Sequence, residues 1–288
     1  MTWQPLTPSR LHRLAFGSAF GMTDVGLVRT SNEDNFVIDE ELGLVMVADG
    51  MGGHEAGEVA SATALTAIRQ YLQQTATQIT YARADTTAAQ VGAFAHKVDG
   101  EADPDATWAD ETVPAVGTMF DAIEFANRQL YNENVAREMS EGAGMGTTLT
   151  GLWRATEAGP LVVFHVGDSR LYRSRGGAFT LLTKDQTLYQ QAVDAGMIDD
   201  LPKRNMLLQA MGPSPTIKPE IKVHALEPGD LFLLCSDGMY GSVAHAEMAD
   251  VVATALSAGL EAVCQRLIDI AKTDGGRDNI TVLLIAVV

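Results

Sequence analysis

The chain alternates between runs of apolar residues and stretches with helical spacing, and this order predicts its elements. Runs rich in Val, Ile and Leu are typical of buried strands. Expected strands cover 26–39, 42–49, 147–153, 161–166, 170–174, 179–182, 217–223, 231–236 and the final run from 280. Apolar residues at helical spacing predict helices over 57–74, 119–139, 245–257 and 259–273. Residues 1–18 are expected to form an arm or a first edge strand.

The order of these elements predicts the fold class. Strands come first, followed by two helices, many strands, two helices and one last strand. This order lacks the strand–helix alternation of a parallel doubly wound sheet. Two antiparallel sheets with helices outside them fit better, so an α+β fold is expected. The sequence shows no internal repeat or linker, which favours one domain over residues 1–288.

Two segments are predicted to be irregular. Residues 186–212 are polar and carry only short helical pieces. Residues 75–117 are expected to form a solvated loop, whose part at about 85–116 is rich in Asp and Glu. An acidic loop that binds a partner is the alternative for this stretch.

Composition and charge exclude several functional classes. The 37 acidic residues outnumber the 20 basic ones, giving a formal net charge of −17, whereas nucleic-acid binding needs a basic surface. Cys235 and Cys264 lie in apolar patterns and are expected to be buried thiols, not a disulfide. The N-terminus lacks the apolar core of a signal peptide, and the longest apolar run is too short to cross a bilayer as a helix. We therefore expect a cytoplasmic protein without a membrane partner.

Three aspartates stand at the ends of apolar runs. Asp49 and Asp237 each follow a predicted strand and precede a glycine, and Asp278 precedes the last strand. Carboxylates at strand ends can converge, and such a cluster repels itself unless a cation holds it together. Oxygen ligands of this kind match Mg²⁺ or Mn²⁺. The alternative is that each Asp-Gly pair simply forms a turn.

Further motifs add candidate groups around these aspartates. Arg29 opens the stretch Arg-Thr-Ser-Asn-Glu-Asp-Asn, and a fixed guanidinium can grip two phosphate oxygens. Glu33 and Asp34 in that stretch can bind metal directly or through water, although an exposed charged turn is the alternative. Asp168 follows another apolar run. The glycine-rich segment after Asp49 matches neither a dinucleotide fingerprint nor a P-loop.

Taken in order, these segments resemble the metal-dependent protein phosphatase family, type 2C, in its bacterial form. The resemblance runs from Arg29 to Thr281 and includes Gly-Met-Gly-Thr-Thr at 144–148 and Thr-Lys-Asp at 183–185. Each motif is weak alone, but the ordered set is specific. It implies a four-layer αββα sandwich, with two central antiparallel sheets flanked by helix pairs and a flap at about 186–212.

The resemblance also implies roles for individual residues. Asp49 would bridge two metal ions, and the carbonyl oxygen of Gly50 would bind the first of them. Asp237 and Asp278 would bind the second. The cofactors would be Mn²⁺ or Mg²⁺, two per active site, with a third in some bacterial members.

Three further positions carry roles by the same resemblance. Glu33 and Asp34 would act mostly through metal-bound water. Asp168 would share a third, weaker metal with Asp237. Arg29 matches the arginine that grips the phosphate.

The implied activity is hydrolysis of phosphoserine and phosphothreonine on proteins, by direct attack of a metal-bridging hydroxide. Met51 stands where some members carry a histidine proposed as general acid, which leaves metal-bound water or His54 for that role. Expected partners are phosphoproteins and a cognate Ser/Thr kinase, with the enzyme a monomer. The alternatives are a phosphate-sensing module without catalysis and a hydrolase of small phosphate esters.

Overall fold

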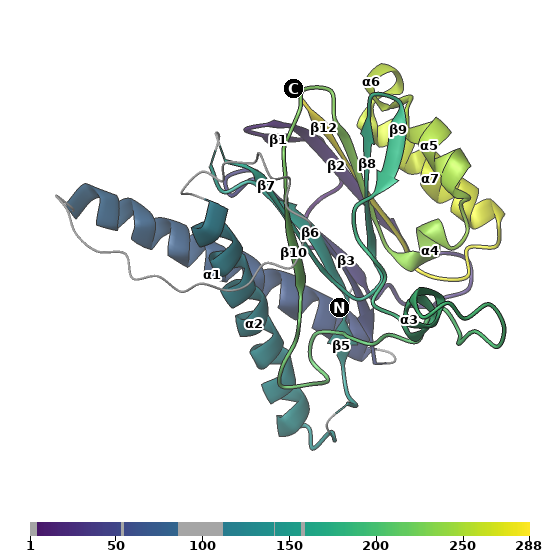
Figure 1. Ribbon diagram of the computed structural model, residues 1–288, viewed down its shortest axis with the longest axis horizontal. Helices are drawn as coiled ribbons and strands as arrows, with labels where there is room; N and C mark the ends of the chain where they lie inside the picture. The colour runs from purple at the N-terminus through teal and green to yellow at the C-terminus, as the bar shows by residue number, and fades with distance from the viewer. Residues whose placement is uncertain (1–4, 53–54, 86–111, 141, 157–158) are drawn as a thin grey trace.

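The computed structural model describes residues 5–52, 55–85, 112–140, 142–156 and 159–288. Two sheets lie face to face, and helices cover both outer faces (Figure 1). This arrangement confirms the predicted four-layer α+β sandwich. None of the helices in the described ranges is long and apolar enough to cross a membrane.

The first sheet is antiparallel throughout and holds the last strand near its middle. Its spatial order is β1 (His12–Leu14), β2 (Gly17–Asp24), β12 (Ile280–Val287), β11 (Leu231–Cys235), β8 (Arg170–Arg175) and β9 (Ala178–Leu181). In β11 and β12 every residue is buried, which explains their continuous apolar sequences.

The second sheet is also antiparallel. Its order is β10 (Glu220–His224), β7 (Leu161–Val166), β6 (Leu149–Trp153), β4 (Leu44–Met51) and β3 (Asp34–Asp39). The short β5 (Gly146–Thr147) pairs with the end of β4. The last residues of β4 thus have partners on both sides.

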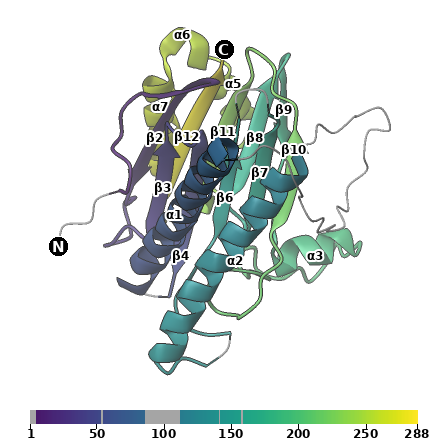
Figure 2. The same cartoon turned by 90° about the vertical axis from the view of Figure 1, so that its left-hand side faces the viewer.

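The helices form the two outer layers. Long helices α1 (Glu55–Asp85) and α2 (Thr112–Ala136) run side by side across the second sheet (Figure 2). The first sheet is covered by α5 (His245–Val252), α6 (Ala255–Ala258) and α7 (Leu260–Thr273). The short α4 (Asp237–Tyr240) packs on the same side as α7, and α3 (Leu188–Asp194) lies outside the two layers.

Several expected element boundaries are wrong. The expected strand over 26–39 begins only at Asp34. Residues 1–18 were expected to form an arm or a first edge strand, and they contain the edge strand β1 together with the start of β2, an interior strand of the first sheet. The expected loop over 75–117 is helical up to Asp85 and again from Thr112. The rest of the acidic 85–116 segment, residues 86–111, lies outside the described residues.

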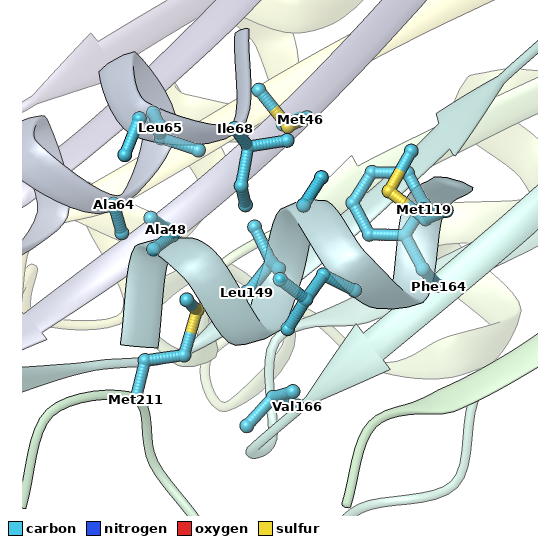
Figure 3. Packing of buried hydrophobic residues seen from close by; sticks show 14 of the residues in the cluster. Met46, Ala48, Ala64, Leu65, Ile68, Met119, Leu149, Phe164, Val166 and Met211 are labelled. Carbon is cyan, nitrogen blue, oxygen red and sulfur yellow. The ribbon is translucent and has the colours of Figure 1, made fainter. Parts of the chain in front are cut away.

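The apolar side chains form three layers of core. One lies between α1, α2 and the second sheet, one between the two sheets, and one between the first sheet and α4–α7. In the first of these, Met46 and Phe164 from the sheet meet Ile68 and Met119 from the two helices (Figure 3).

Phe164 should be among the most costly core residues to truncate. Its ring is fully buried and lies against Gly151, where any side chain would collide with it. Phe164→Ala is expected to lower the free energy of unfolding by about 3–5 kcal/mol in a urea titration. Leu256→Ala on α6, where the side chain is 68% exposed, should change it by less than about 0.5 kcal/mol. Equal losses in the two variants would contradict this packing.

Candidate active site

A cavity of about 480 Å³ opens where β4, β11 and the β7–β8 turn end. The residues lining it are Arg29, Thr30, Ser31, Glu33, Asp49, Gly50, Met51, Gly52, Thr148, Asp168, Asn205, Leu207, Asp237, Asp278 and Asn279. All the predicted site residues except Asp34 are in this group. Segments more than 200 residues apart in the chain therefore share one cavity.

Asp49 and Gly50 do not form the turn considered from the sequence. Both belong to β4, where Asp49 pairs with Asp34 and Gly50 pairs with Thr147. Glycine is needed at 50 because a Cβ would collide with the Gly57 carbonyl and lie 2.8 Å from the carbonyl oxygen of Glu33. Close packing, not a positive φ, sets this requirement.

Hydrogen bonds hold the Asp49 backbone in place. Its N–H donates to Thr148 Oγ1 at 2.9 Å. Its carbonyl oxygen accepts from the Thr148 N–H at 2.9 Å and from Thr147 Oγ1 at 2.9 Å. The side chain of Asp49 therefore starts from a rigid position on the cavity wall.

Asp237 is likewise not in a turn: it is the first residue of α4, directly after β11. A Cβ at Gly238 would collide with the Asn279 carbonyl. The absence of a side chain at 238 therefore lets the chain carrying Asp237 approach the chain carrying Asp278.

Arg29 lies against one of these carboxylates. Its Nη2 donates to Asp278 Oδ2 at 2.7 Å, and the two side chains are 48% and 34% exposed. The guanidinium is thus oriented at the cavity mouth by Asp278, with donors left to face a ligand.

Asp34 lies beneath the cavity instead of lining it. Its side chain is fully buried, and its Oδ2 accepts hydrogen bonds from Ser236 Oγ and Thr281 Oγ1, both at 2.6 Å. Thr281 belongs to β12 of the opposite sheet and Ser236 directly follows β11 of that sheet, so Asp34 links the two sheets below the site. The prediction that Asp34 acts through bound water stays a prediction.

Four aspartates of the site disfavour their charged forms when no cation is present. Burial, together with repulsion by Asp237, raises the pKa of Asp168 to about 7, and burial raises that of Asp34 to about 7 as well. Burial and the charges of the neighbouring aspartates also raise the pKa values of Asp49 and Asp237.

The donor set fits a hard divalent cation. The Oδ1 atoms of Asp34 and Asp237 are buried without a hydrogen-bond partner, which is costly unless an ion or water satisfies them. Every ionisable ligand predicted here offers carboxylate oxygen, the donor that Mg²⁺ and Mn²⁺ prefer. Within the described ranges no group of three or more His, Cys, Asp or Glu side chains already forms a compact metal cage. The fit therefore rests on the donor chemistry and the unsatisfied oxygens.

Several supporting residues were not assigned roles from the sequence. Asn279 accepts from the Glu33 N–H at 2.8 Å and donates to the carbonyl oxygens of Val25 and Ser31, so it ties the Arg29 loop to the last strand. Its place directly after Asp278 was the available signal. Asn205 lines the flap side of the cavity, and the sequence around it contains no recognisable motif that indicated this position.

His165 makes the stability of the sandwich sensitive to acid. Its Nε2 lies 3.1 Å from the Lys184 carbonyl oxygen and its Nδ1 lies 2.8 Å from Thr150 Oγ1. Burial lowers its pKa to about 4, below the usual value of about 6.5. The unfolded chain therefore binds this proton more readily, so the contribution of the neutral ring is full above pH 6.5 and is lost as the pH falls toward 4.

We expect this histidine to cost about 2 kcal/mol of stability between pH 7 and pH 5. Urea titrations of the protein and of His165→Gln at both pH values measure the effect. The variant should lose less stability between pH 7 and pH 5, because it lacks the His165 ring while all other titratable groups are the same in both proteins. An identical pH dependence would contradict the assignment.

Comparison with known proteins agrees with this geometry. The family described as Protein phosphatase 2C matches residues 28–279. A serine/threonine phosphatase stp of Listeria innocua is 32% identical over 273 residues, which cover 91% of this chain and 93% of that protein. The solved Mycobacterium tuberculosis serine/threonine phosphatase PstP/Ppp is 28% identical, with a TM-score of 0.71 over 93% of this chain and 97% of that chain. The catalytic domain of PstP in complex with two manganese ions is also 28% identical, with a TM-score of 0.69 over 94% and 97% of the two chains.

The matched range contains every residue that lines the cavity. It begins one residue before Arg29 and ends at Asn279, two residues before the end of the ordered motifs at Thr281. The chain belongs to the protein phosphatase 2C family of metal-dependent phosphatases.

Proposed function

We propose that this protein is a Mn²⁺- or Mg²⁺-dependent phosphatase that hydrolyses phosphoserine and phosphothreonine on proteins. The observation that carries the proposal is the convergence of Asp49, Asp168, Asp237 and Asp278 with Arg29 in one cavity. The manganese-containing PstP structure and the phosphatase relatives support the same assignment.

In this proposal the cavity holds two divalent ions. Asp49 would help to hold both, because it stands at the rigid end of β4 and interacts with the charges of Asp168, Asp237 and Asp278. The carbonyl oxygen of Gly50 would bind the first ion, and Asp237 with Asp278 would bind the second. The close approach at Gly238 supports the pairing of these last two.

Three acidic residues have outer roles. Glu33, which lines the cavity, acts through bound water. Asp34, which lies below it, orients water or supports the two sheets through its hydrogen bonds. Asp168 is 6% exposed and faces the charge of Asp237, so these two residues are the proposed ligands of a third ion.

The chemistry supplied by two bound ions is an activated water as nucleophile and neutralisation of phosphate charge. The residues of this chain position the reactants. Arg29, oriented by Asp278, grips two equatorial oxygens of the phosphate. Thr148 and Asn279 fix the backbones that carry Asp49 and the Arg29 loop. Attack is direct, without a covalent enzyme intermediate.

The remaining predictions extend this proposal. Met51 lines the cavity at the position of the histidine found in some members, and His54 lies outside the described residues. Because the Met51 side chain has no proton to donate, a bound water would protonate the leaving oxygen, and His54 is the second candidate for that role. We also propose one domain over residues 1–288, cytoplasmic location, monomeric state, phosphoprotein substrates and an opposing Ser/Thr kinase.

Turnover assays test the proposal directly. An aryl phosphate, a phosphothreonine peptide and a small metabolite phosphate are assayed with Mn²⁺ and then with excess chelator. We expect turnover of the aryl phosphate and the peptide, with loss of both in chelator. Absence of metal-dependent turnover contradicts the proposal, and turnover of the metabolite alone would assign a small-molecule hydrolase instead.

A further inference from the structure

Arg170 stands at the start of β8, two residues after Asp168, and contacts one residue of its own strand and two other segments. Its guanidinium binds Asp185 in two places, with Nε 2.9 Å from Oδ1 and Nη2 2.7 Å from Oδ2. Its Nη1 donates to the Tyr172 hydroxyl at 3.1 Å. The guanidinium carbon lies 3.7 Å from the centroid of the Tyr240 ring. All three nitrogens of the Arg170 guanidinium and one of its faces therefore have contacts within the protein.

Asp185 immediately precedes the flap and brings it against the β7–β8 turn, which contains Asp168. The next residue, Gln186, donates its N–H to the Gly167 carbonyl at 2.7 Å, and its Oε1 accepts from the Gly167 N–H at 3.0 Å. The Gln186 carbonyl accepts from the Leu208 N–H at 2.8 Å. The hydrogen bonds of Gln186 therefore also hold the flap segment before Leu208, which places Asn205 and Leu207 on the cavity wall.

Tyr240 extends the contact to the other side of the site. It is the last residue of α4, whose first residue is Asp237. Helix α4 and the flap helix α3 lie at the same end of the sandwich (Figure 1). The Arg170 side chain, which contacts Asp185 and the Tyr240 ring, is mostly buried: 20% of it is exposed, and 13% of the Asp185 side chain. A bidentate ion pair that is largely removed from water has a fixed geometry and is costly to break.

We propose that Arg170 is a positioning residue, which clamps the flap to the catalytic cavity through Asp185 and to the Asp237 helix through Tyr240. A small aryl phosphate fills the cavity without needing the flap, whereas a phosphopeptide extends over Asn205 and Leu207. Loosening the clamp therefore weakens peptide binding more than turnover of the small substrate. The kinetic part of this inference rests on the proposed phosphatase activity.

The chain offers a matched control on the same strand. Arg175 also binds a carboxylate in two places, with Nε and Nη2 each 2.6 Å from the oxygens of Asp230. Neither Arg175 nor Asp230 lines the cavity or contacts the flap base. Arg170→Lys and Arg175→Lys thus remove the same kind of bidentate contact, at the flap and away from it.

Two measurements test the clamp. The first compares KM and kcat for a phosphothreonine peptide and an aryl phosphate at saturating Mn²⁺. Arg170→Lys should raise KM for the peptide about tenfold and KM for the aryl phosphate less than about threefold, and Asp185→Asn should do the same. The double variant should add little to either single change, because both break one contact. Arg175→Lys should leave the ratio of the two KM values at its original value.

The second measurement needs no activity. Trypsin cuts after Lys203 and Arg204, which are exposed in the flap, and the rate of cleavage under native conditions reports how often the flap detaches. Arg170→Lys should raise this rate about tenfold, and Arg175→Lys should not. Unchanged cleavage, or equal effects of the two lysine variants, overturns the clamp. A uniform loss of activity on both substrates with no change in cleavage also overturns it, whereas an inactive original protein with faster cleavage in Arg170→Lys contradicts only the phosphatase proposal.

Discussion

Asp237→Asn is expected to lower kcat at least about a thousandfold and, without metal, to make the protein more stable. Asparagine keeps the shape of the side chain but removes a charge that the proposed second ion needs. In the metal-free chain that charge is unfavourable, because burial and Asp278 raise the pKa of Asp237. Removing it should raise the melting temperature by about 2–4 °C.

The opposite signs of these two effects make the prediction specific. Thermal melts with and without Mn²⁺, together with aryl phosphate turnover, measure both. Mn²⁺ should stabilise the original protein and should stabilise the variant much less. Asp250→Asn, a change of the same kind on α5 away from this cavity, should alter neither quantity. Full activity in Asp237→Asn would remove this residue from the proposed ligand set.

Arg29→Ala should have the second-largest effect, a loss of about a hundredfold in kcat/KM. The guanidinium is the charged donor that reaches the cavity from the β2–β3 loop, and Asp278 holds it at 2.7 Å. Without it, two phosphate oxygens lose a bidentate partner as negative charge is redistributed during attack. Steady-state kinetics on aryl phosphate at saturating Mn²⁺ measures the loss.

Two further variants show which property of Arg29 matters. Arg29→Lys keeps the charge but not the planar fork, so it should recover only part of the activity. Arg277→Ala removes an exposed arginine beside Asp278 that does not line the cavity, and it should cost less than about threefold. A loss in Arg277→Ala as large as that in Arg29→Ala would point to a general effect of charge near the site.

The strand-end aspartates could be predicted because their surroundings are local in sequence. Asp49, Asp237 and Asp278 each adjoin an apolar run that becomes a buried strand, and strand ends meet at one edge of a sandwich. The role of the glycines could not be predicted. Gly50 and Gly238 are required by collisions with the carbonyls of residues elsewhere in the fold, and a turn preference is the only signal that an Asp-Gly pair carries alone.

The separation of Glu33 from Asp34 has a similar cause. Glu33 precedes β3 and lines the cavity, whereas the carboxylate of Asp34, the first residue of β3, is buried by its hydrogen bonds to Ser236 and Thr281. Because the two residues are adjacent in the motif, the same role was predicted for both. In the structure only Glu33 lines the cavity. Strand β2 was not predicted, because its sequence, Gly-Ser-Ala-Phe-Gly-Met-Thr-Asp, is rich in small residues and has no apolar run. It is a strand because it pairs with β12 along its whole length.

The most direct test of the central claim is an anomalous difference map from a crystal of the Mn²⁺-loaded protein. We expect two strong peaks in the cavity: one within ligand distance of the Gly50 carbonyl oxygen and one near Asp237 and Asp278. Both should lie within reach of the Asp49 carboxylate. Hard divalent ions bind protein oxygen atoms at about 2.0–2.6 Å. A map with strong peaks elsewhere and none among these carboxylates, at saturating Mn²⁺, would contradict it.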